Sequence, residues 1–310
     1  STAKILITLL IFFLIVCSII LLIAGMNPFD ALFHAMTGLA TGGFSTYSDS
    51  IAHFQSGAIE IATVIVMMIG ATNIAIHFAV LSGNYRELLF FRNIEVRSFV
   101  AFLLIFSAMG AVWLISMTSL SATEAINDSF YHIVSAMTTT GWTVASGGDL
   151  SASYPAVFLL TLAICAIMGG HSVSTSGGIR QIRVALIIKS VWWHIKKTLL
   201  PSTVVFPRSY HHIVKKTVTD SRMTDIYVFV SIYLLMLLIS TIVVMAHGYS
   251  LERSFLESSS SLTSLGMGFG IASTAAAEGV KVMLIINMWV GRIEIVPVLL
   301  FFASFSRRFK

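Results

Sequence analysis

Long apolar runs alternate with short polar stretches along the chain. Three runs exceed about eighteen residues with little or no charge, the length that indicates a membrane-spanning helix, and lie at residues 5–25, 99–119 and 227–246. Three further runs are apolar but are interrupted or shortened by polar residues, at residues 61–80, 156–167 and 282–302. The pattern therefore predicts an integral membrane protein with several helical spans.

A polar, glycine-containing stretch recurs three times between these runs. The three stretches read "DALFHAMTGLATGGFST", "DSFYHIVSAMTTTGWTV" and "RSFLESSSSLTSLGMGFG". Each has a polar residue thirteen positions before a glycine, and these glycines are Gly43, Gly141 and Gly266. An apolar run precedes and follows each stretch, so the unit of span, short helix, glycine strip and span occurs three times.

The short helices are predicted from their N-terminal residues. Asn27-Pro28 is an N-cap followed by proline at the first helical position, and Ser121 or Thr123 begins the second copy. From each start to the glycine strip is about a dozen residues, which reaches roughly half a bilayer. The chain must then return as extended backbone, which is tolerated at that depth only where it is buried in protein or lines a water-filled path.

Each strip is therefore predicted to direct backbone carbonyls towards a cation. The C-terminus of a helix carries a partial negative charge, and glycine permits backbone conformations in which carbonyls align. Rings of carbonyls can replace the water shell of an ion. The candidate filter residues are Thr41, Gly42, Gly43, Phe44, Ser45, Thr139, Thr140, Gly141, Trp142, Thr143, Ser264, Leu265, Gly266, Met267 and Gly268. The aromatic residues Phe44 and Trp142 are expected to wedge their strips against the surroundings.

Composition and charge agree with a membrane protein and set its orientation. Hydrophobic residues make up 56% of the 310 residues and charged residues 11%, whereas a soluble domain has about a quarter charged residues. Lysine and arginine gather at residues 86–97, 189–197, 208–222 and 307–310. By the positive-inside rule these segments are cytoplasmic, so we interpret them as topology signals and not as a nucleic-acid interface. The opposite connections are acidic, which would concentrate cations there.

Five short motifs resemble those of the Trk/Ktr/HKT superfamily of potassium transporters, and are most similar to bacterial and archaeal TrkH-type subunits. They are "TGGFS", "TTGWT", "SLGMG", "GGHSVSTSGGIR" and "GRIEI", in the order and spacing of the family. The resemblance implies an all-α polytopic membrane protein in which pore repeats surround a pseudo-fourfold cation pore. It implies K+ sites at Thr41, Gly42, Thr139, Thr140, Gly141, Leu265 and Gly266.

The family also has an intramembrane loop that gates the pore from below, and here the resemblance assigns it to residues 169–180. The candidate gate residues are Gly169, Gly170, Ser172, Ser174, Ser176, Gly177, Gly178 and Arg292. The alternative interpretation is a kinked helix whose small residues allow close packing. A charged residue in a span is functional by default, so we expect Arg292 to reach the loop carbonyls. Pairing of Arg292 with Glu294 is disfavoured, because residues two apart on a helix do not face each other.

The chain departs from the family in having three repeats instead of four, and we expect it to be a piece of a longer protein. The predicted divisions are a repeat at residues 1–93, a repeat with the gate loop at 94–205, a basic cytoplasmic loop at 206–224 and a repeat at 225–310. The family further implies a multi-pass protein of the cell inner membrane, surrounded by lipid, that forms homodimers. A cytosolic nucleotide-binding subunit would supply regulation, so no cofactor is expected in this chain.

Several alternatives remain open on the sequence alone. The transported ion is expected to be K+, with a Na+-conducting or Na+/K+-symporting member of the superfamily as the alternative. "GHSVS" has part of the nucleophile motif of serine hydrolases, but its fifth residue is serine and no strand precedes it, so an enzyme is not expected. A carrier with a midplane site predicts inverted repeats, whereas these run in one direction. His34 and His132 are expected to pack within helices, and His211 and His212 to be solvated.

Overall fold

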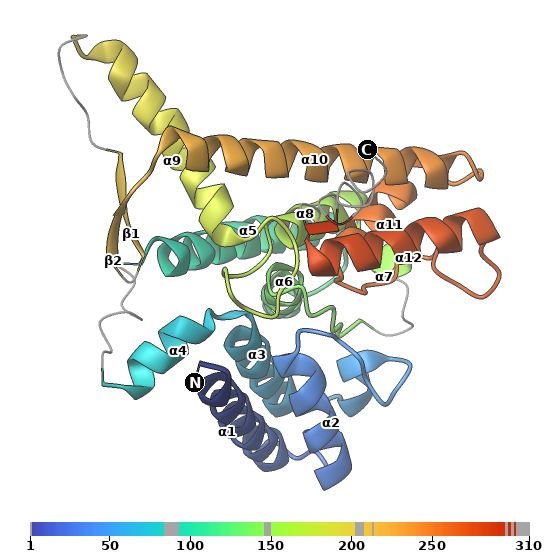
Figure 1. Ribbon diagram of the computed structural model, residues 1–310. Helices are drawn as coiled ribbons and strands as arrows, with labels where there is room; N and C mark the ends of the chain where they lie inside the picture. The colour runs from blue at the N-terminus through green and yellow to red at the C-terminus, as the bar shows by residue number, and fades with distance from the viewer. Residues whose placement is uncertain are drawn as a thin grey trace.

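The computed structural model describes residues 2–83, 93–145, 150–201, 208–212, 214–294, 297–298 and 301. Helices make up most of this part of the chain, and one antiparallel hairpin accompanies them (Figure 1). The prediction of an all-α protein is therefore confirmed, with the addition of a two-stranded hairpin that the sequence pattern did not indicate.

The helices follow the predicted threefold order of span, short helix and span. The first repeat contains α1 (Thr2–Ile23), α2 (Pro28–Leu39), η1 (Ser50–Phe54), α3 (Gly57–Ala71) and α4 (Ile74–Leu81). The second contains α5 (Ile94–Met117), α6 (Ala122–Met137), α7 (Leu150–Ser153), α8 (Ala156–Met168) and α9 (Gln181–Leu199). The hairpin of β1 (Ser209–His212) and β2 (Val214–Thr217) leads to the third repeat, which contains α10 (Asp220–Met245), α11 (Leu251–Thr263) and α12 (Glu278–Ile293). In Figure 1 the first repeat lies at the bottom, α5 and α6 in the middle, α10 above them, and α11 and α12 to their right.

The three short helices α2, α6 and α11 begin at capping residues. Asn27 accepts a hydrogen bond from the backbone N–H of Asp30 at 2.9 Å, as the Asn-Pro start predicts. Ser121 forms a capping box with Glu124, which decides between the two predicted starts of the second helix. Ser250 caps α11 by accepting a hydrogen bond from the backbone N–H of Arg253. Local sequence therefore determines where each helix that enters the membrane begins.

One of the interrupted apolar runs is sharply bent. Residues 61–80 form the end of α3 and most of α4, and these helices meet at an angle of 100°. The break lies at Thr72 and Asn73, where Thr72 has an extended backbone and the Asn73 side chain caps α4. An asparagine that caps a new helix competes with continuation of the old one, which explains the bend. The helices α1, α5 and α10 are each long and apolar enough to cross a membrane.

Polar side chains lie inside the molecule and large apolar side chains lie on its outside. The residues of α6 from Tyr131 to Met137 are all buried, and the strip that follows α6 is buried with them. By contrast, many leucine and isoleucine side chains of α1, α5 and α10 are exposed, including Ile7, Leu104 and Leu235. Exposed apolar patches of this extent indicate contact with lipid, so the fold is that of a multi-pass membrane protein whose polar elements are sheltered at its centre.

Candidate functional site

The three glycine strips share one unusual backbone pattern. In each strip the glycine and the residue two positions earlier both have positive φ: Thr41 and Gly43 (48° and 67°), Thr139 and Gly141 (54° and 92°), and Ser264 and Gly266 (56° and 79°). The residue between each pair is not among those with positive φ. Alternation of left-handed and ordinary residues turns successive peptide planes the same way, so neighbouring carbonyls can point to one side. A positive φ is rare outside glycine, which makes its recurrence at Thr41, Thr139 and Ser264 informative.

The strips lie side by side in the order of the chain. A Cβ atom built on Gly43 would lie 1.8 Å from the carbonyl oxygen of Thr140, and one on Gly141 would lie 1.8 Å from that of Leu265. Each of these carbonyls belongs to the residue before the next glycine, so the same contact occurs twice. A Cβ on Gly266 would meet no described atom within 4 Å. The first strip thus lies against the second, and the second against the third.

The short helices hold the strips through contacts that repeat in all three copies. A hydroxyl on each helix donates to the carbonyl seven residues later, immediately after the strip glycine: Thr37 to Phe44 (3.0 Å), Ser135 to Trp142 (2.7 Å) and Ser260 to Met267 (2.9 Å). The backbone carbonyl of the same helix residue accepts a hydrogen bond from the N–H of the residue before the strip glycine. These bonds run from Gly42 to Thr37, from Thr140 to Ser135 and from Leu265 to Ser260. These matched bonds explain why the three strips have the same conformation.

A titratable side chain on each short helix braces the far end of its strip. His34 Nε2 lies 3.0 Å from the Ser45 hydroxyl, and His132 Nε2 lies 2.9 Å from the Thr143 hydroxyl. In the third copy a Glu257 carboxylate oxygen accepts a 3.1 Å hydrogen bond from the backbone N–H of Phe269. The histidines are hydrogen-bonded within their helices, as expected, but they also support the strips, which the sequence reasoning missed. The recurrence of histidine eleven residues before a hydroxyl residue was the available signal.

Only one of the two aromatic residues wedges its strip. Trp142 is fully buried and donates from Nε1 to the Phe44 carbonyl at 3.1 Å, which ties the second strip to the first. Phe44 itself is 71% exposed, so the prediction of a wedge is wrong for this residue among its described neighbours. Gly38 leaves room for the indole, because a Cβ there would lie 2.5 Å from the ring. The last strip residue, Gly268, accepts from the backbone N–H of Leu150 through its carbonyl.

The segment of residues 169–180, which we call the gate loop, interrupts the helical path between α8 and α9. Gly169 ends α8 with a φ of 68°, and the backbone N–H of Ile179 returns to the Ile167 carbonyl at 2.8 Å. Gln181 secures this return, because its side chain donates to the Gly169 carbonyl and its backbone N–H to that of Gly170. The loop is therefore a non-helical excursion and not a kinked helix, as the four glycines predict.

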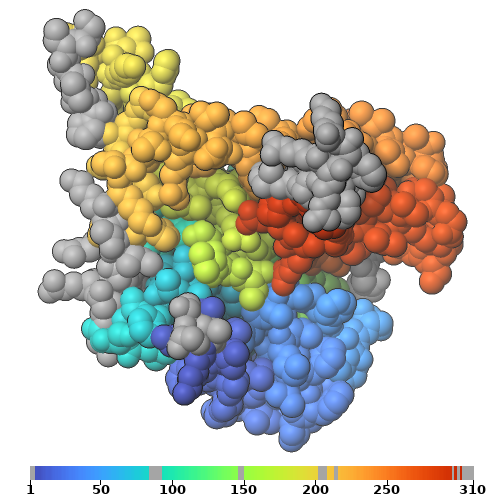
Figure 2. Space-filling model, in the orientation of Figure 1, coloured from blue at the N-terminus to red at the C-terminus, as the bar shows by residue number. Residues whose placement is uncertain are grey.

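The gate loop contacts the C-terminal ends of all three short helices. Thr175 donates to the Leu39 carbonyl at the end of α2, and the N–H of Gly177 donates to the Thr139 hydroxyl just after α6. A Cβ on Gly177 would lie 2.0 Å from the carbonyl of Thr263, the last residue of α11. In Figure 2 the yellow-green part of the chain that contains the loop is visible in the middle of the face, between the blue first repeat and the red third repeat. The loop thus lies against the side of the strips that is nearest to the helix ends.

The hydroxyl residues of the loop are hydrogen-bonded within it and to its neighbours. The Ser174 hydroxyl donates to the His171 carbonyl and lies 2.7 Å from that of Ser176. The Ser172 hydroxyl accepts from Asn73 at 3.3 Å. In the described part of the chain no histidine bonds to the Ser172 hydroxyl, and a serine nucleophile needs such a base.

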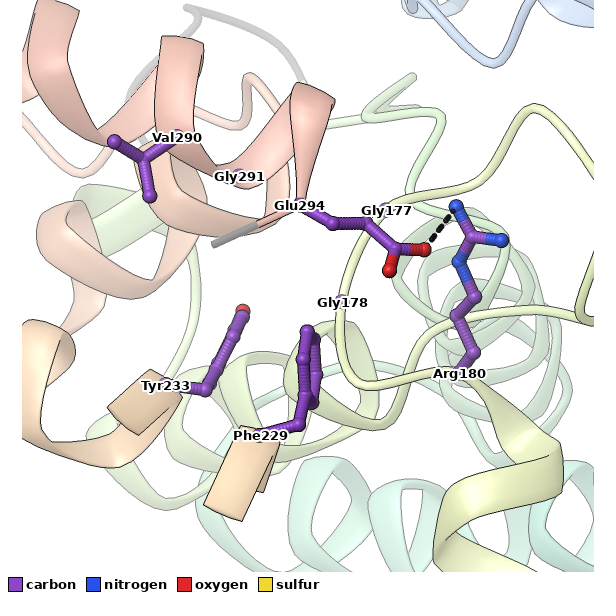
Figure 3. Close-up of a pocket in the computed structure, with 8 residues that line it drawn as sticks. All are labelled: Gly177, Gly178, Arg180, Phe229, Tyr233, Val290, Gly291 and Glu294. Atoms are coloured by element: carbon purple, nitrogen blue, oxygen red, sulfur yellow. Dashed lines mark ion pairs between the residues drawn. The ribbon is translucent and has the colours of Figure 1, made fainter. Parts of the chain in front are cut away.

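Arg292 reaches the gate loop, as predicted. Its guanidinium donates to the Thr175 carbonyl at 2.7 Å and to the Ala40 carbonyl, at the end of α2, at 3.2 Å. Glu294, whose partner the sequence did not reveal, forms ion pairs with Arg180 at 2.9 Å and Arg183 at 3.0 Å. Figure 3 shows Glu294 pointing from the end of α12 towards Arg180, with Gly177 and Gly178 of the loop beside them. These pairs attach the start of α9 to the end of α12.

Sequence reasoning also missed a buried acid beside the loop. Glu95, the second residue of α5, is fully buried and bonds to Ser172 and to His212. The expectation that His212 is solvated is wrong, because its ring nitrogen Nε2 lies 2.7 Å from a Glu95 oxygen. The available signal was a carboxylate directly after a helix-capping asparagine, at Asn93-Ile94-Glu95, within a segment that is otherwise mostly basic.

Comparison with known proteins gives a consistent result over nearly the whole chain. Residues 1–308 match the model of the TrkH family, described as cation transport protein. The chain is 31% identical over 308 residues to the Trk system potassium uptake protein TrkH of Escherichia coli K12, covering 97% of this chain and 62% of that protein. It is 32% identical over 294 residues to the protein of the same name from Halomonas elongata, covering 93% and 58%.

A solved structure has the same fold. The crystal structure of the potassium transporter TrkH from Vibrio parahaemolyticus superposes with a TM-score of 0.85 at 28% identity, covering 97% of this chain and 64% of that one. The chain thus spans about three fifths of the length of the curated relatives that it matches.

Proposed function

The chain belongs to the TrkH family of cation transport proteins, and from this premise we propose that its three strips form part of the selectivity filter of a potassium-uptake pathway across the cell membrane. The observation that carries the proposal is the alternation of positive φ at equivalent positions of three strips that lie side by side. The family is one of transporters, so the chain is a membrane transport protein and not an enzyme. Its transported ion, by the names of the relatives, is potassium.

Carbonyl and hydroxyl oxygens carry out the selection in this proposal. A K+ ion that enters the strips exchanges its water for the carbonyls of Thr41, Gly42, Thr139, Thr140, Gly141, Leu265 and Gly266, at little net cost if the oxygens are already in place. The C-terminal ends of α2, α6 and α11 add partial negative charge on the same side. The matched supports from Thr37, Ser135 and Ser260 keep the oxygens in place.

The gate loop then controls the passage of an ion beyond the filter. It contacts all three short helices at the ends from which an ion would leave the strips. Arg292 holds the loop by its Thr175 carbonyl and places a positive charge beside the path. Opening would require the loop to release these contacts.

A fourth strip beside Gly266 would close the ring. The open space at Gly266 and the shorter length of the chain relative to its relatives support this arrangement. Residues 1–93, 94–205 and 225–310 would then be three of four equivalent repeats, and residues 206–224 a cytoplasmic connection. A second copy of the protein and a cytosolic nucleotide-binding subunit would complete the assembly, with the basic cytoplasmic segments as docking sites for the subunit.

Reconstitution tests this function. The intact transporter in proteoliposomes is expected to take up radioactive Rb+, a K+ analogue, and excess K+ should suppress the uptake more strongly than excess Na+. Equal suppression by both ions would favour the Na+-conducting or symporting alternative. Absence of cation uptake by protein that is folded and inserted would contradict the proposal.

A further inference from the structure

We propose that Glu95 is a positioning residue for the gate loop, and that through His212 it connects the loop to the cytoplasmic β1–β2 hairpin. The inference rests on the proposed function to the extent that residues 169–180 form a gate. It adds a second charged side chain, besides Arg292, that holds the loop, and it assigns a role to a hairpin that has none in the filter.

The position of Glu95 demands an explanation. Its side chain is fully buried at the first turn of α5, where Asn93 caps the helix. The positive end of the helix dipole favours an anion there. A buried carboxylate is nevertheless costly unless hydrogen-bond donors surround it, and an apolar residue would usually serve stability as well. The identity of the donors therefore indicates what the carboxylate does.

All three donors come from segments at or beside the gate loop. One Glu95 oxygen accepts from the backbone N–H of Ser172 at 2.8 Å. The other lies 2.7 Å from His212 Nε2 and 3.4 Å from the side-chain nitrogen of Asn73, at the break between α3 and α4. The Asn73 nitrogen also reaches the Ser172 hydroxyl. One carboxylate thus joins α5, the loop, the α3–α4 break and the hairpin.

Glu95 and Arg292 hold the loop through opposite kinds of backbone group. The acid accepts from the N–H of Ser172, whereas the base donates to the carbonyl of Thr175, three residues later. The two charged residues come from α5 and α12, in different repeats. Hydrogen bonds to charged groups are stronger than those between neutral groups. The loop tip between residues 172 and 175 is therefore held at each end by a charged side chain, and loss of either contact is expected to loosen it.

The hairpin is built to transmit movement to this point. Tyr210 is buried in an apolar cluster that includes Leu186 and Trp193 of α9 and Met223 of α10. Lys189 of α9 donates to the Ser209 carbonyl at the start of β1, and the strand ends at His212. Displacement of α9 or of the hairpin by a cytoplasmic partner would therefore move the His212 ring away from Glu95. In Figure 1 the hairpin lies beside the start of α5, next to α9 and α10.

The test measures the accessibility of the loop and the flux separately. Val173 is 62% exposed at the loop tip, so Val173→Cys provides a site for a thiol reagent, whereas Cys17 and Cys165 are buried. In the intact transporter, His212→Ala should raise the modification rate of Val173→Cys about tenfold, the effect of one lost hydrogen bond to a charged group. His212→Gln retains a donor and should restore most of the original rate. Lys216→Ala, on the same hairpin but exposed, is the matched control and should leave the rate unchanged.

Glu95→Gln provides an independent variant, since it removes the charge but retains one acceptor for Ser172. It should raise both the modification rate and the basal K+ flux without changing the K+/Na+ ratio. Modification rates within twofold of the parent protein in both His212→Ala and Glu95→Gln would overturn the proposal, as would equal rates in His212→Ala and His212→Gln. Faster modification with unchanged flux would support the positioning role and instead contradict the loop as a gate.

Discussion

Replacement of Gly141 by alanine tests the contact on which the filter geometry depends. The added Cβ would lie 1.8 Å from the Leu265 carbonyl oxygen, whereas real Cβ contacts are essentially never shorter than 3.0 Å. The second and third strips must therefore separate by roughly 1.2 Å, the difference between these two distances. The positive φ of 92° adds strain of about 1–2 kcal/mol for a residue with a side chain. The displaced oxygen belongs to the set that we propose coordinates the ion, so we expect Gly141→Ala to reduce ion selectivity.

Gly248 offers a matched control for the backbone strain. It has the same φ of 92° in the turn after α10, but a Cβ there would meet no atom of the described residues within 4 Å. Gly248→Ala should therefore lower stability by a similar 1–2 kcal/mol of strain and leave ion selectivity unchanged. Comparison of Gly141→Ala with Gly248→Ala therefore separates the effect of backbone strain from the effect of the close contact between the second and third strips.

The assay is the ratio of K+ to Na+ flux in proteoliposomes, with thermal unfolding in parallel. Gly141→Ala should reduce the ratio at least about tenfold, which corresponds to about 1.4 kcal/mol in the relative stabilisation of the two ions. Gly248→Ala should retain the parent ratio. A folded Gly141→Ala protein with the parent ratio would refute the assignment of these strips to the filter.

Three further predictions concern the supports of the filter and loop. Arg292→Lys should raise basal flux several-fold, roughly the effect of one charged hydrogen bond, because an ammonium group cannot span two carbonyls as the guanidinium does; unchanged flux would contradict the role of Arg292 in holding Thr175. Ser135→Ala should lower the free energy of unfolding by about 1–3 kcal/mol, because the Trp142 carbonyl loses its buried donor; an unchanged melting temperature would show that the bond contributes nothing. The hydrogen bond from the capping Ser121 lowers the pKa of the exposed Glu124 carboxyl. The stability that this bond adds is therefore present above the unfolded pKa of about 4.3, and it is lost as the pH falls through the lower folded pKa. Glu124→Gln should therefore flatten the pH dependence of unfolding in that range, and a profile identical to that of the parent would count against the capping box.

Features that depend on nearby residues were predictable from the sequence. Apolar runs of membrane-spanning length indicated α1, α5 and α10, because burial in lipid requires such a run in one continuous helix. The Asn-Pro pair and Ser121 indicated helix starts, because capping is a local hydrogen bond. The internal repeat aligned the three strip glycines with one another, and the positive φ angles occur at these aligned glycines and two residues before each.

The local pattern failed where a distant segment competed with it. Residues 61–80 have the hydropathy of a single span, but Asn73 caps a new helix and faces Glu95 and the gate loop at the break. Phe44 and Trp142 have equivalent positions in the repeat, yet only Trp142 is enclosed, because Gly38 leaves space for its indole. Equivalent sequence positions therefore did not guarantee equivalent packing.

Sequence alone indicated the class of the protein, the threefold recurrence of the glycine strip and the carbonyl groups that we propose meet the ion. These features arise from hydropathy, spacing and the conformational freedom of glycine. Folding in three dimensions was needed to bring the strips together in order, to set the loop across three helix ends, and to pair Glu95 with His212 and Glu294 with Arg180. A buried charge takes whichever partner the packing brings to it, and that partner is more than one hundred residues away in both pairs. Such long-range pairings leave no periodic trace in a sequence, and they hold the gate loop of this protein.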